Sequence, residues 1–416
     1  MLAQFSKKII KFFKTLGPGL VTGASDDDPS GIATYSQAGA QFGYSTLWTA
    51  FFTFPLMAAV QGMCARIGII TQQGLTVTLR DYYSKTILYV MLLFSLPAIT
   101  LNIGADIQGM GAVAHMMLPQ VPVFVFSCLF TGLLLYTIIK YPYQKIAQIL
   151  KWLCLSLLLY FIVPFMVQQD WMVVLKNTTV PTIKMDKDFI SIIVAILGTT
   201  ISPYLFFWQA TMEAEEIGKM HKKVVIDKNI LKGMATDINV GMLLSNVVMF
   251  FIILTAASVL NKSGITHIDT VDQAAKSLEP LAGKFATIIF TLGVIGTGLI
   301  AIPVLAGSQS YMLAETFGWK AGLNKKFSQA RGFYLTITAS LLVGLSLDFL
   351  GISPIKALYY TAILYGVTAP VLIAIVMHIA NNKKIMGNFT NNLLSNILGV
   401  ITLIVMTVAA FLLFYL

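Results

Sequence analysis

The stretch Asp26-Asp27-Asp28-Pro29-Ser30-Gly31 places three carboxylates and a helix-breaking proline inside a segment that is otherwise apolar. That segment runs from Leu16-Gly17-Pro18-Gly19-Leu20 to Ala38-Gly39-Ala40 and is long enough to cross a membrane. An ionisable group at bilayer depth is costly, and broken backbone there is tolerated only where it lines a water-filled cavity or is buried in protein. The stretch therefore indicates an ion site within a broken transmembrane helix.

The whole chain has the composition of a polytopic membrane protein. Of its 416 residues, 57% are hydrophobic and only 11% are charged, and the mean hydropathy is +0.79. A soluble domain usually carries about a quarter charged residues. Apolar stretches recur from end to end and leave no polar block large enough for a separate domain, so we expect one integral membrane domain over residues 1–416. Residues 1–14 are basic and amphipathic rather than typical of a signal peptide.

The spacing of the apolar stretches predicts eleven transmembrane helices and no sheet. The predicted spans are 17–42, 47–70, 86–117, 121–139, 146–168, 189–217, 233–260, 284–314, 332–350, 354–380 and 393–416. Lys and Arg residues gather in alternate loops, which the positive-inside rule assigns to the cytoplasm. We therefore expect a multi-pass protein of the cell membrane with a cytoplasmic N-terminus and an extracytoplasmic C-terminus. The formal charge of +10 then follows from topology, and no nucleic-acid partner is expected.

A second interruption lies in the sixth span, at Gly198-Thr199-Thr200-Ile201-Ser202-Pro203-Tyr204. Pro203 lacks a backbone donor, so carbonyl groups of Thr199 and its neighbours can be left without helical partners and can bind cations. Spans one and six are corresponding members of two five-helix sets that begin on opposite sides of the membrane. Such paired breaks predict the midplane site of a secondary transporter. The expected architecture is LeuT-like, with inverted repeats at about 17–168 and 189–380 and an extra helix at about 393–416.

The two breaks offer only oxygen ligands. Their side-chain donors are Asp28, Ser30, Ser202 and Tyr204, and neither break contains Met, Cys or His. Oxygen ligands suit hard ions such as magnesium, calcium and manganese, whereas thioether and imidazole groups favour softer transition metals. The inventory predicts a site for a hard divalent cation.

Four motifs are spread along the chain: Gly17-Pro18-Gly19, Asp28-Pro29-Ser30-Gly31, Gly39-Ala40-Gln41-Phe42-Gly43-Tyr44 and Met386-Gly387-Asn388-Phe389-Thr390-Asn391 with Asn396 and Gly399. In these motifs the sequence resembles the Nramp family of divalent-metal transporters, and the resemblance runs along nearly the whole chain. The resemblance implies a transporter whose metal ion is the substrate, with no resident cofactor. It also implies the fold with broken helices one and six.

The metal-site signatures depart from the family pattern. Gly31 stands where the family has an Asn ligand, and Ser202-Pro203-Tyr204 replaces Met-Pro-His. Gln209 aligns with a second family histidine, and Asp106-Ile107-Gln108-Gly109 keeps the Asp of Asp-Leu-Ala-Glu but loses the Glu. The pattern resembles the Nramp-related magnesium transporter branch, which is described as carrying magnesium and manganese without proton coupling. A roomier site without a thioether suits a partly hydrated magnesium ion.

The resemblance also suggests roles for individual residues. Asp28 is expected to be the central anionic ligand, with Ser202 ligating directly or through a water and with the carbonyl groups of Ser25 and Thr199 completing the shell. The expected metal site further includes three residues at family ligand positions, namely Gly31, Tyr204 and, by a looser alignment, Thr368.

Other polar residues are candidates for the ion pathway: Asp26, Asp27, Asp106 and Gln209. Two alternatives stay open, because Asp26 and Asp27 can be satisfied helix-end carboxylates and Asp106 can be a buried hydrogen-bonded acid. Glu213, Glu215 and Glu216 fall near the predicted cytoplasmic mouth, where we expect solvated ion pairs with nearby lysines.

Three functional classes follow from these observations. The leading one is an uncoupled facilitator for hydrated divalent cations, chiefly Mg²⁺ with Mn²⁺ as a second substrate. The rivals are a proton-coupled Mn²⁺ or Fe²⁺ symporter and a sodium-coupled transporter of an organic solute, the latter disfavoured because the Asp cluster is too anionic for a substrate carboxylate. No nucleophile–base pair or phosphate-binding loop indicates an enzyme. The expected partners are the metal ion and the lipid bilayer, and we expect a monomer.

Overall fold

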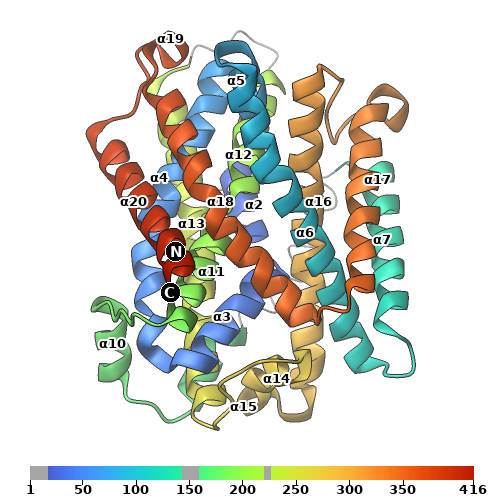
Figure 1. Cartoon of the computed structure of the whole chain (residues 1–416), viewed down its shortest axis with the longest axis vertical. Coiled ribbons are helices and arrows are strands. Elements are labelled where there is room, and N and C mark those ends of the chain that lie inside the picture. The colour runs from blue at the N-terminus through green and yellow to red at the C-terminus, as the bar shows by residue number, and fades with distance from the viewer. Residues whose placement is uncertain (1–16, 143–158, 220–225) are drawn as a thin grey trace, which may run out of the picture.

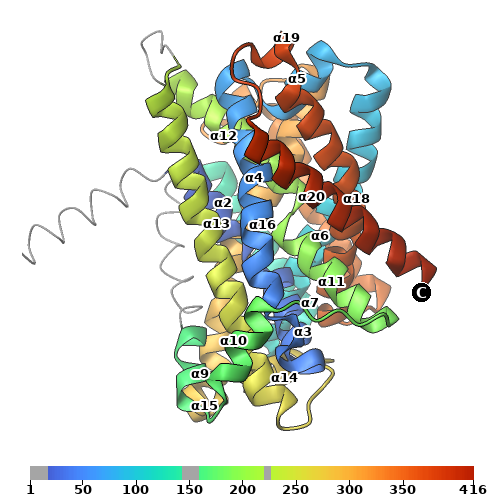
Figure 2. The same cartoon turned by 90° about the vertical axis from the view of Figure 1, so that its left-hand side faces the viewer.

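The computed structural model describes residues 17–142, 159–219 and 226–416, and no strand occurs in these ranges. Long helices pack side by side along the longest axis of the molecule (Figure 1). Short helices lie at the two ends: α5 (Leu75–Tyr82) and α19 (Lys383–Met386) at one end, and α9 (Val163–Met166), α10 (Trp171–Thr179), α14 (Val271–Ala275) and α15 (Glu279–Ala282) at the other (Figures 1 and 2). The predicted all-helical architecture is confirmed.

Nine helical segments in the described ranges are long and apolar enough to cross a membrane. They are α4 (Trp48–Thr71), α6 (Lys85–Met117), α7 (Val123–Lys140), the pair α11 (Lys187–Thr200) and α12 (Pro203–Lys219), α13 (Lys228–Ala256) with the π-helical turn η3 (Ala257–Asn261), α16 (Ala286–Phe317), α17 (Arg331–Leu345) with η7 (Ser346–Leu350), α18 (Pro354–Asn381) and α20 (Leu393–Tyr415). Each matches a predicted span. The predicted span 146–168 lies largely outside the described residues, so the total of eleven stays a prediction.

The predicted span 17–42 forms two shorter helices, α2 (Pro18–Asp26) and α3 (Pro29–Phe42). Pro29 occupies the first turn of α3, where its missing N–H costs nothing, and Asp28 is the N-cap of that helix. The second break falls at Ile201-Ser202, between α11 and α12, and Pro203 is again the first residue of the new helix. Both helices are therefore interrupted where the sequence predicts.

Among the spanning helices of the described ranges, the start of α13 differs most from the prediction. Helix α13 begins at Lys228 rather than at 233, because the side chain of Asp227 caps it. The Asp227 carboxylate accepts the backbone N–H groups of Asn229 at 3.0 Å and Ile230 at 2.9 Å. Such caps satisfy the free donors of a first helical turn and extend a helix beyond its apolar stretch.

Glycines hold the half-helices close to their neighbours. A Cβ atom added at Gly23 of α2 would lie 2.3 Å from the carbonyl oxygen of Gly241 on α13. A Cβ atom added at Gly198 of α11 would lie 2.0 Å from the carbonyl oxygen of Ala362 on α18. Only glycine fits at such a close approach of two backbones, so these contacts fix the positions of both breaks.

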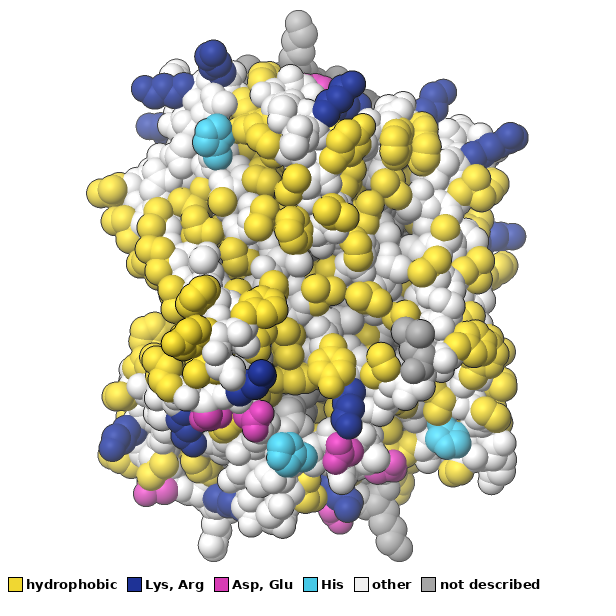
Figure 3. Space-filling view, in the orientation of Figure 1, with side chains coloured by type: hydrophobic (Ala, Val, Ile, Leu, Met, Phe, Trp, Pro, Cys, Tyr) yellow, Lys and Arg dark blue, Asp and Glu magenta, His cyan; other side chains and the backbone are white. Residues whose placement is uncertain are grey.

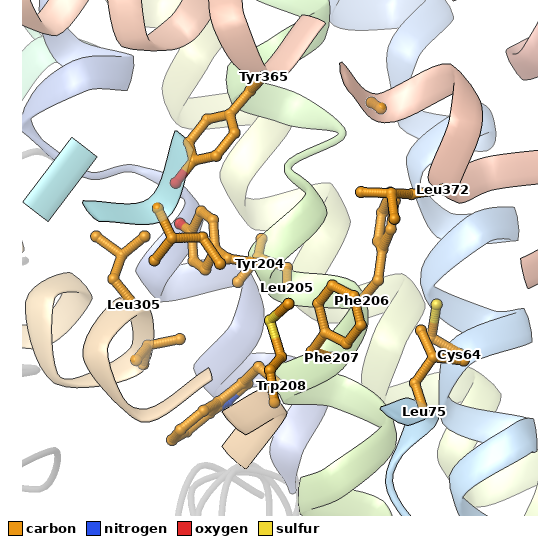
Figure 4. Packing of buried hydrophobic residues seen from close by; sticks show 14 of the residues in the cluster. Cys64, Leu75, Tyr204, Leu205, Phe206, Phe207, Trp208, Leu305, Tyr365 and Leu372 are labelled. Carbon is orange, nitrogen blue, oxygen red and sulfur yellow. The ribbon is translucent and has the colours of Figure 1, made fainter. Parts of the chain in front are cut away.

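The apolar residues that follow the second break anchor α12 in the core. Tyr204, Phe206, Phe207 and Trp208 are all buried (Figure 4). The ring of Tyr204 lies 5.8 Å, centroid to centroid, from that of Tyr365 on α18. Burial of several large aromatic side chains is strongly favourable and leaves the start of α12 little freedom to move alone.

The surface separates into an apolar middle and charged ends. Figure 3 shows Lys and Arg gathered at the end that carries α5 and α19, while the opposite end mixes acidic and basic side chains. Exposed apolar residues such as Leu129 and Leu133 of α7 and Phe411 and Phe414 of α20 cover the middle. An apolar band around the molecule is the surface expected of a protein surrounded by lipid.

Candidate ion site at the two helix breaks

Asp28 lies at the centre of the first break and is 2% exposed. Its Oδ1 accepts a hydrogen bond of 2.6 Å from the hydroxyl of Ser30 and one of 2.8 Å from the backbone N–H of Gly31. Its Oδ2 accepts a hydrogen bond of 3.0 Å from Nδ2 of Asn102 on α6. The predicted central carboxylate is thus held by donors from two helices. Gly31, predicted at a ligand position, contributes its N–H to this cap.

Asn102, which donates to Asp28 from α6, was not predicted from the sequence. Asn102 is fully buried, and the hydroxyl of Thr361 on α18 lies 3.0 Å from its Oδ1. The available signal was its spacing, because Asn102 precedes Asp106 by one helical turn and so shares its face of α6. Nothing in the local sequence links Thr361 to this site, since the contact depends on how α18 packs against α6.

Asp26 and Asp27 point to a different neighbour. The hydroxyl of Ser245 on α13 donates to Oδ2 of Asp26 at 2.8 Å and lies 3.4 Å from Oδ1 of Asp27. The three carboxylates therefore do not converge on one point. In the described ranges no group of three or more His, Cys, Asp or Glu residues is placed to hold a metal ion. Among the hydrogen bonds of the described residues, Asp28 is the one carboxylate of the three that is held by donors of both α3 and α6.

At the second break, the side chain of Ser202 turns back on α11. Its hydroxyl lies 2.5 Å from the carbonyl oxygen of Thr199 and 3.0 Å from that of Gly198. The Thr199 hydroxyl lies 3.0 Å from the Ala195 carbonyl of its own helix, so Thr199 offers its main-chain oxygen rather than its side chain. A carbonyl oxygen has two lone pairs, which leaves one for an ion.

The two breaks contact each other directly. The hydroxyl of Tyr204 donates a hydrogen bond of 2.9 Å to the carbonyl oxygen of Ser25, which lies in the last turn of α2. Figure 4 shows the hydroxyl groups of Tyr204 and Tyr365 at the ends of the two rings that face one another. The predicted residues Ser25, Asp28 and Tyr204 are therefore neighbours in space.

Thr368 and Asp106 differ in their surroundings. The Thr368 hydroxyl lies 2.9 Å from the Leu364 carbonyl of its own helix. Among the described residues it forms no hydrogen bond with either break. Asp106 on α6 is fully buried, and neither carboxylate oxygen accepts a hydrogen bond of normal length. Its carboxylate interacts electrostatically with Asp28 and with the backbone N–H of Ser30. Asp106 thus lies beside the first break, and no basic side chain of the described residues forms an ion pair with it.

Gln209 on α12 links Thr22 of α2 to Glu213 through hydrogen bonds. Its Oε1 accepts a hydrogen bond of 2.5 Å from the hydroxyl of Thr22 on α2, and its Nε2 donates at 2.9 Å to Glu213. The expectation of a solvated ion pair is wrong for Glu213, which is 6% exposed and lies one helical turn from Gln209 on the buried face of α12. Glu215 accepts a hydrogen bond of 2.6 Å from the hydroxyl of Tyr311 on α16.

A further acidic residue, Asp237 on α13, holds the N-terminus of α2 and was not predicted. Its carboxylate accepts the backbone N–H groups of Gly17 at 2.9 Å, Gly19 at 2.6 Å and Leu20 at 3.2 Å. A carboxylate at a helix N-terminus satisfies free donors and complements the helix dipole. The partners lie more than 200 positions apart, so no local pattern pointed to this contact.

Comparison with solved structures assigns the fold. The manganese transporter of Eremococcus coleocola, solved with an aromatic bis-isothiourea compound, superposes with a TM-score of 0.77 at 17% identity, over 96% of this chain and 85% of that one. Mhp1, a nucleobase-cation-symport-1 family transporter, gives a TM-score of 0.56 at 11% identity, over 96% and 92%. The arrangement of the helices, with its paired breaks, is therefore a LeuT-like membrane transporter fold.

The family follows from the sequence. The family model described as natural resistance-associated macrophage protein-like matches residues 19–416, and the chain belongs to this family, Nramp. The protein named divalent metal cation transporter MntH from Caldanaerobacter subterraneus is 27% identical over 94% of this chain and 90% of its own length. The MntH of Staphylococcus saprophyticus is 25% identical over 97% and 92%. These relatives are named as transporters and not as enzymes.

Proposed function

We propose that this chain carries divalent metal cations across the cell membrane by alternating access, chiefly Mg²⁺ with Mn²⁺ as an additional substrate, and without moving protons. Support for divalent cations comes from Nramp membership and from the names of the MntH relatives. The metal is the substrate, and no resident cofactor is required. Family membership also favours a metal ion over an organic solute.

The observation that carries the magnesium preference is the donor set around Asp28. The ligands that we propose beside this one carboxylate are neutral oxygens from the two breaks, namely the carbonyl groups of Ser25 and Thr199 and the hydroxyl of Ser202. Mg²⁺ dehydrates reluctantly and is usually held by one or two carboxylates together with several waters. A single carboxylate among weak ligands fits an ion that keeps part of its water shell.

The absence of proton coupling is supported by the side chains at the positions of the family's titratable groups. Gln209 holds Thr22 and Glu213 with a neutral amide, which cannot release or take up a proton as a histidine does. Gly109 stands where the family has a glutamate on the third helix. A cation could then cross without a stoichiometric proton.

A second candidate, proton-coupled Mn²⁺ transport, is favoured by two specific observations. Asp106 is buried beside Asp28 without a hydrogen bond of normal length. A Cβ atom added at Gly298 of α16 would lie 2.4 Å from the thioether sulfur of Met110 and 3.3 Å from the ring of Pro29, so a soft sulfur lies near the first break. A thioether would favour Mn²⁺ over Mg²⁺.

The orientation rests on charge. The end that carries α5 and α19 exposes Arg80, Lys85, Lys383 and Lys384, and we assign it to the cytoplasm under the positive-inside rule. The N-terminus is then cytoplasmic and the C-terminus extracytoplasmic. The site is built within one chain, so a monomer suffices for transport.

Flux into proteoliposomes tests the proposal. Purified protein is expected to admit Mg²⁺, and Mn²⁺ in competition with it, at the same rate with and without a pH gradient, and the internal pH should not change during uptake. Uptake of Mn²⁺ that requires an inward proton gradient, or that excess Mg²⁺ fails to inhibit, would support the second candidate instead.

A further inference from the structure

We propose that Asn102 is a positioning residue that restricts Asp28 to a single free lone pair and thereby selects Mg²⁺ over Ca²⁺. The inference rests on the proposed function, because it assigns the ion preference of that same site to a residue on α6. Two buried polar residues, Asn102 and Thr361, set the geometry around Asp28.

Most acceptor positions of the Asp28 carboxylate are already occupied. An ionised carboxylate has about four acceptor positions, two on each oxygen. On Asp28, Oδ1 accepts two hydrogen bonds, from the Ser30 hydroxyl and the Gly31 N–H, and Oδ2 accepts one, from Asn102. Three positions are occupied by these hydrogen bonds, and the backbone N–H of Ser30 also interacts with the carboxylate. Among the hydrogen bonds of the described residues, Oδ2 accepts that of Asn102 alone, so a cation meets one free position on Oδ2 and binds Asp28 through that oxygen.

Ca²⁺ and Mg²⁺ differ in how they bind carboxylates. Ca²⁺ takes six to eight oxygen ligands and often binds a carboxylate through both oxygens, whereas Mg²⁺ demands near-octahedral geometry and keeps several waters. A carboxylate limited to one contact offers Ca²⁺ too little to replace its lost waters. The same carboxylate suits Mg²⁺, because one direct bond leaves the other positions to water and to neutral oxygens.

The amide of Asn102 lies between Asp28 and Thr361. Its Nδ2 faces the Asp28 carboxylate and its Oδ1 faces the Thr361 hydroxyl, which also lies 2.8 Å from the carbonyl of Leu358. All three side chains are buried, with Asn102 fully so and Thr361 6% exposed. Thr361 therefore fixes which end of the amide points to Asp28, and with it the direction of the free lone pair.

The test compares two matched variants of Thr361 with a near-isosteric change of Asn102. Thr361→Val keeps the shape and removes the hydroxyl, Thr361→Ser keeps the hydroxyl, and Asn102→Leu removes the amide. Uptake of Mg²⁺ and Ca²⁺ into proteoliposomes gives KM and kcat for each ion. Loss of an outer partner of a metal ligand typically changes affinity about 10- to 100-fold, so Asn102→Leu should raise the KM for Mg²⁺ at least about tenfold relative to that for Ca²⁺.

The control outcomes separate this role from a structural one. Thr361→Val should shift the ratio of the two KM values in the same direction, and Thr361→Ser should restore it. Thr402→Val on α20 should leave the ratio unchanged, because among the described residues the Thr402 hydroxyl donates to the Leu398 carbonyl of its own helix alone. Circular dichroism and a melting curve verify that each variant is folded. If Asn102→Leu does not fold, the comparison of Thr361→Val with Thr361→Ser supplies the answer.

Two results would contradict different statements. If Asn102→Leu and Thr361→Val lower uptake of both ions by the same factor, the positioning role is wrong while magnesium transport stands. If the unaltered protein carries no Mg²⁺ at all, the proposed function itself fails.

Discussion

The hydroxyl of Tyr204 donates a hydrogen bond of 2.9 Å to the carbonyl oxygen of Ser25, and this bond joins the two broken helices. Tyr204 belongs to the first turn of α12 and Ser25 to the last turn of α2. The bond occupies one of the two lone pairs of a carbonyl that we propose as an ion ligand. Tyr204 thus keeps the breaks together and leaves Ser25 one position for the ion.

We expect Tyr204→Phe to weaken the packing of the breaks without removing an ion ligand. The loss of one buried hydrogen bond should lower the free energy of unfolding by about 1 kcal/mol, since the Ser25 carbonyl loses its partner. The melting temperature in detergent should fall, while Mg²⁺ uptake should persist. Complete loss of uptake by a folded Tyr204→Phe protein would show that the hydroxyl itself is required for transport.

Asp237→Ala should release the N-terminal end of α2 from α13. Three backbone N–H groups, at Gly17, Gly19 and Leu20, lose their common acceptor. In a cysteine-free background, a cysteine at the buried position Thr22 should then react faster with a water-soluble maleimide applied from the cytoplasmic side.

The matched control for Asp237→Ala is Asp227→Ala on the same helix. Asp227 caps α13 itself and makes no contact with α2 among the hydrogen bonds of the described residues. It should therefore leave the reactivity at position 22 unchanged. Equal reactivity in both variants would contradict the role of Asp237 as the anchor of α2.

Gly241→Ala should destabilise the protein through a collision of backbones. The added Cβ atom would lie 2.2 Å from the carbonyl oxygen of Gly19, so α2 and α13 must separate. Overpacking of this kind costs about 1–3 kcal/mol. Gly233→Ala, on the same helix, meets nothing within 4 Å and should be tolerated. Thermal melting of the two variants measures the difference, and equal melting temperatures would mean that the helices are not held at this distance.

Much of the fold could be predicted because membrane-spanning helices are long apolar runs that are easily recognised in a sequence. The length of an apolar run decides where a helix crosses, and Pro29 and Pro203 mark the first residues after the two breaks. The ends were less predictable where a polar cap extends a helix, as Asp227 does for α13. The apolar pattern does not report such a cap.

The site was predictable only where its residues lie in the breaks. A hydrogen bond joins Tyr204 to Ser25, and Asp28 caps the helix that follows the first break, while their role as ion ligands stays a prediction. Asn102, Thr361 and Asp237 were missed because each acts across a contact between helices far apart in the sequence. The solvated ion pair predicted for Glu213 was wrong for a related reason, since its helix turns that side chain toward Gln209 and the interior.

The central claim is that Asp28 is the one carboxylate of a site for a hydrated magnesium ion, and Mg²⁺ uptake by Asp28→Asn proteoliposomes tests it most directly. Asparagine keeps the size of the side chain but removes the negative charge, so we expect a folded protein with uptake reduced at least about 100-fold, in line with the loss of a charged ion ligand. The exposed Asp227→Asn serves as the control for handling and reconstitution. Mg²⁺ uptake by Asp28→Asn at the rate of the unaltered protein would contradict the account.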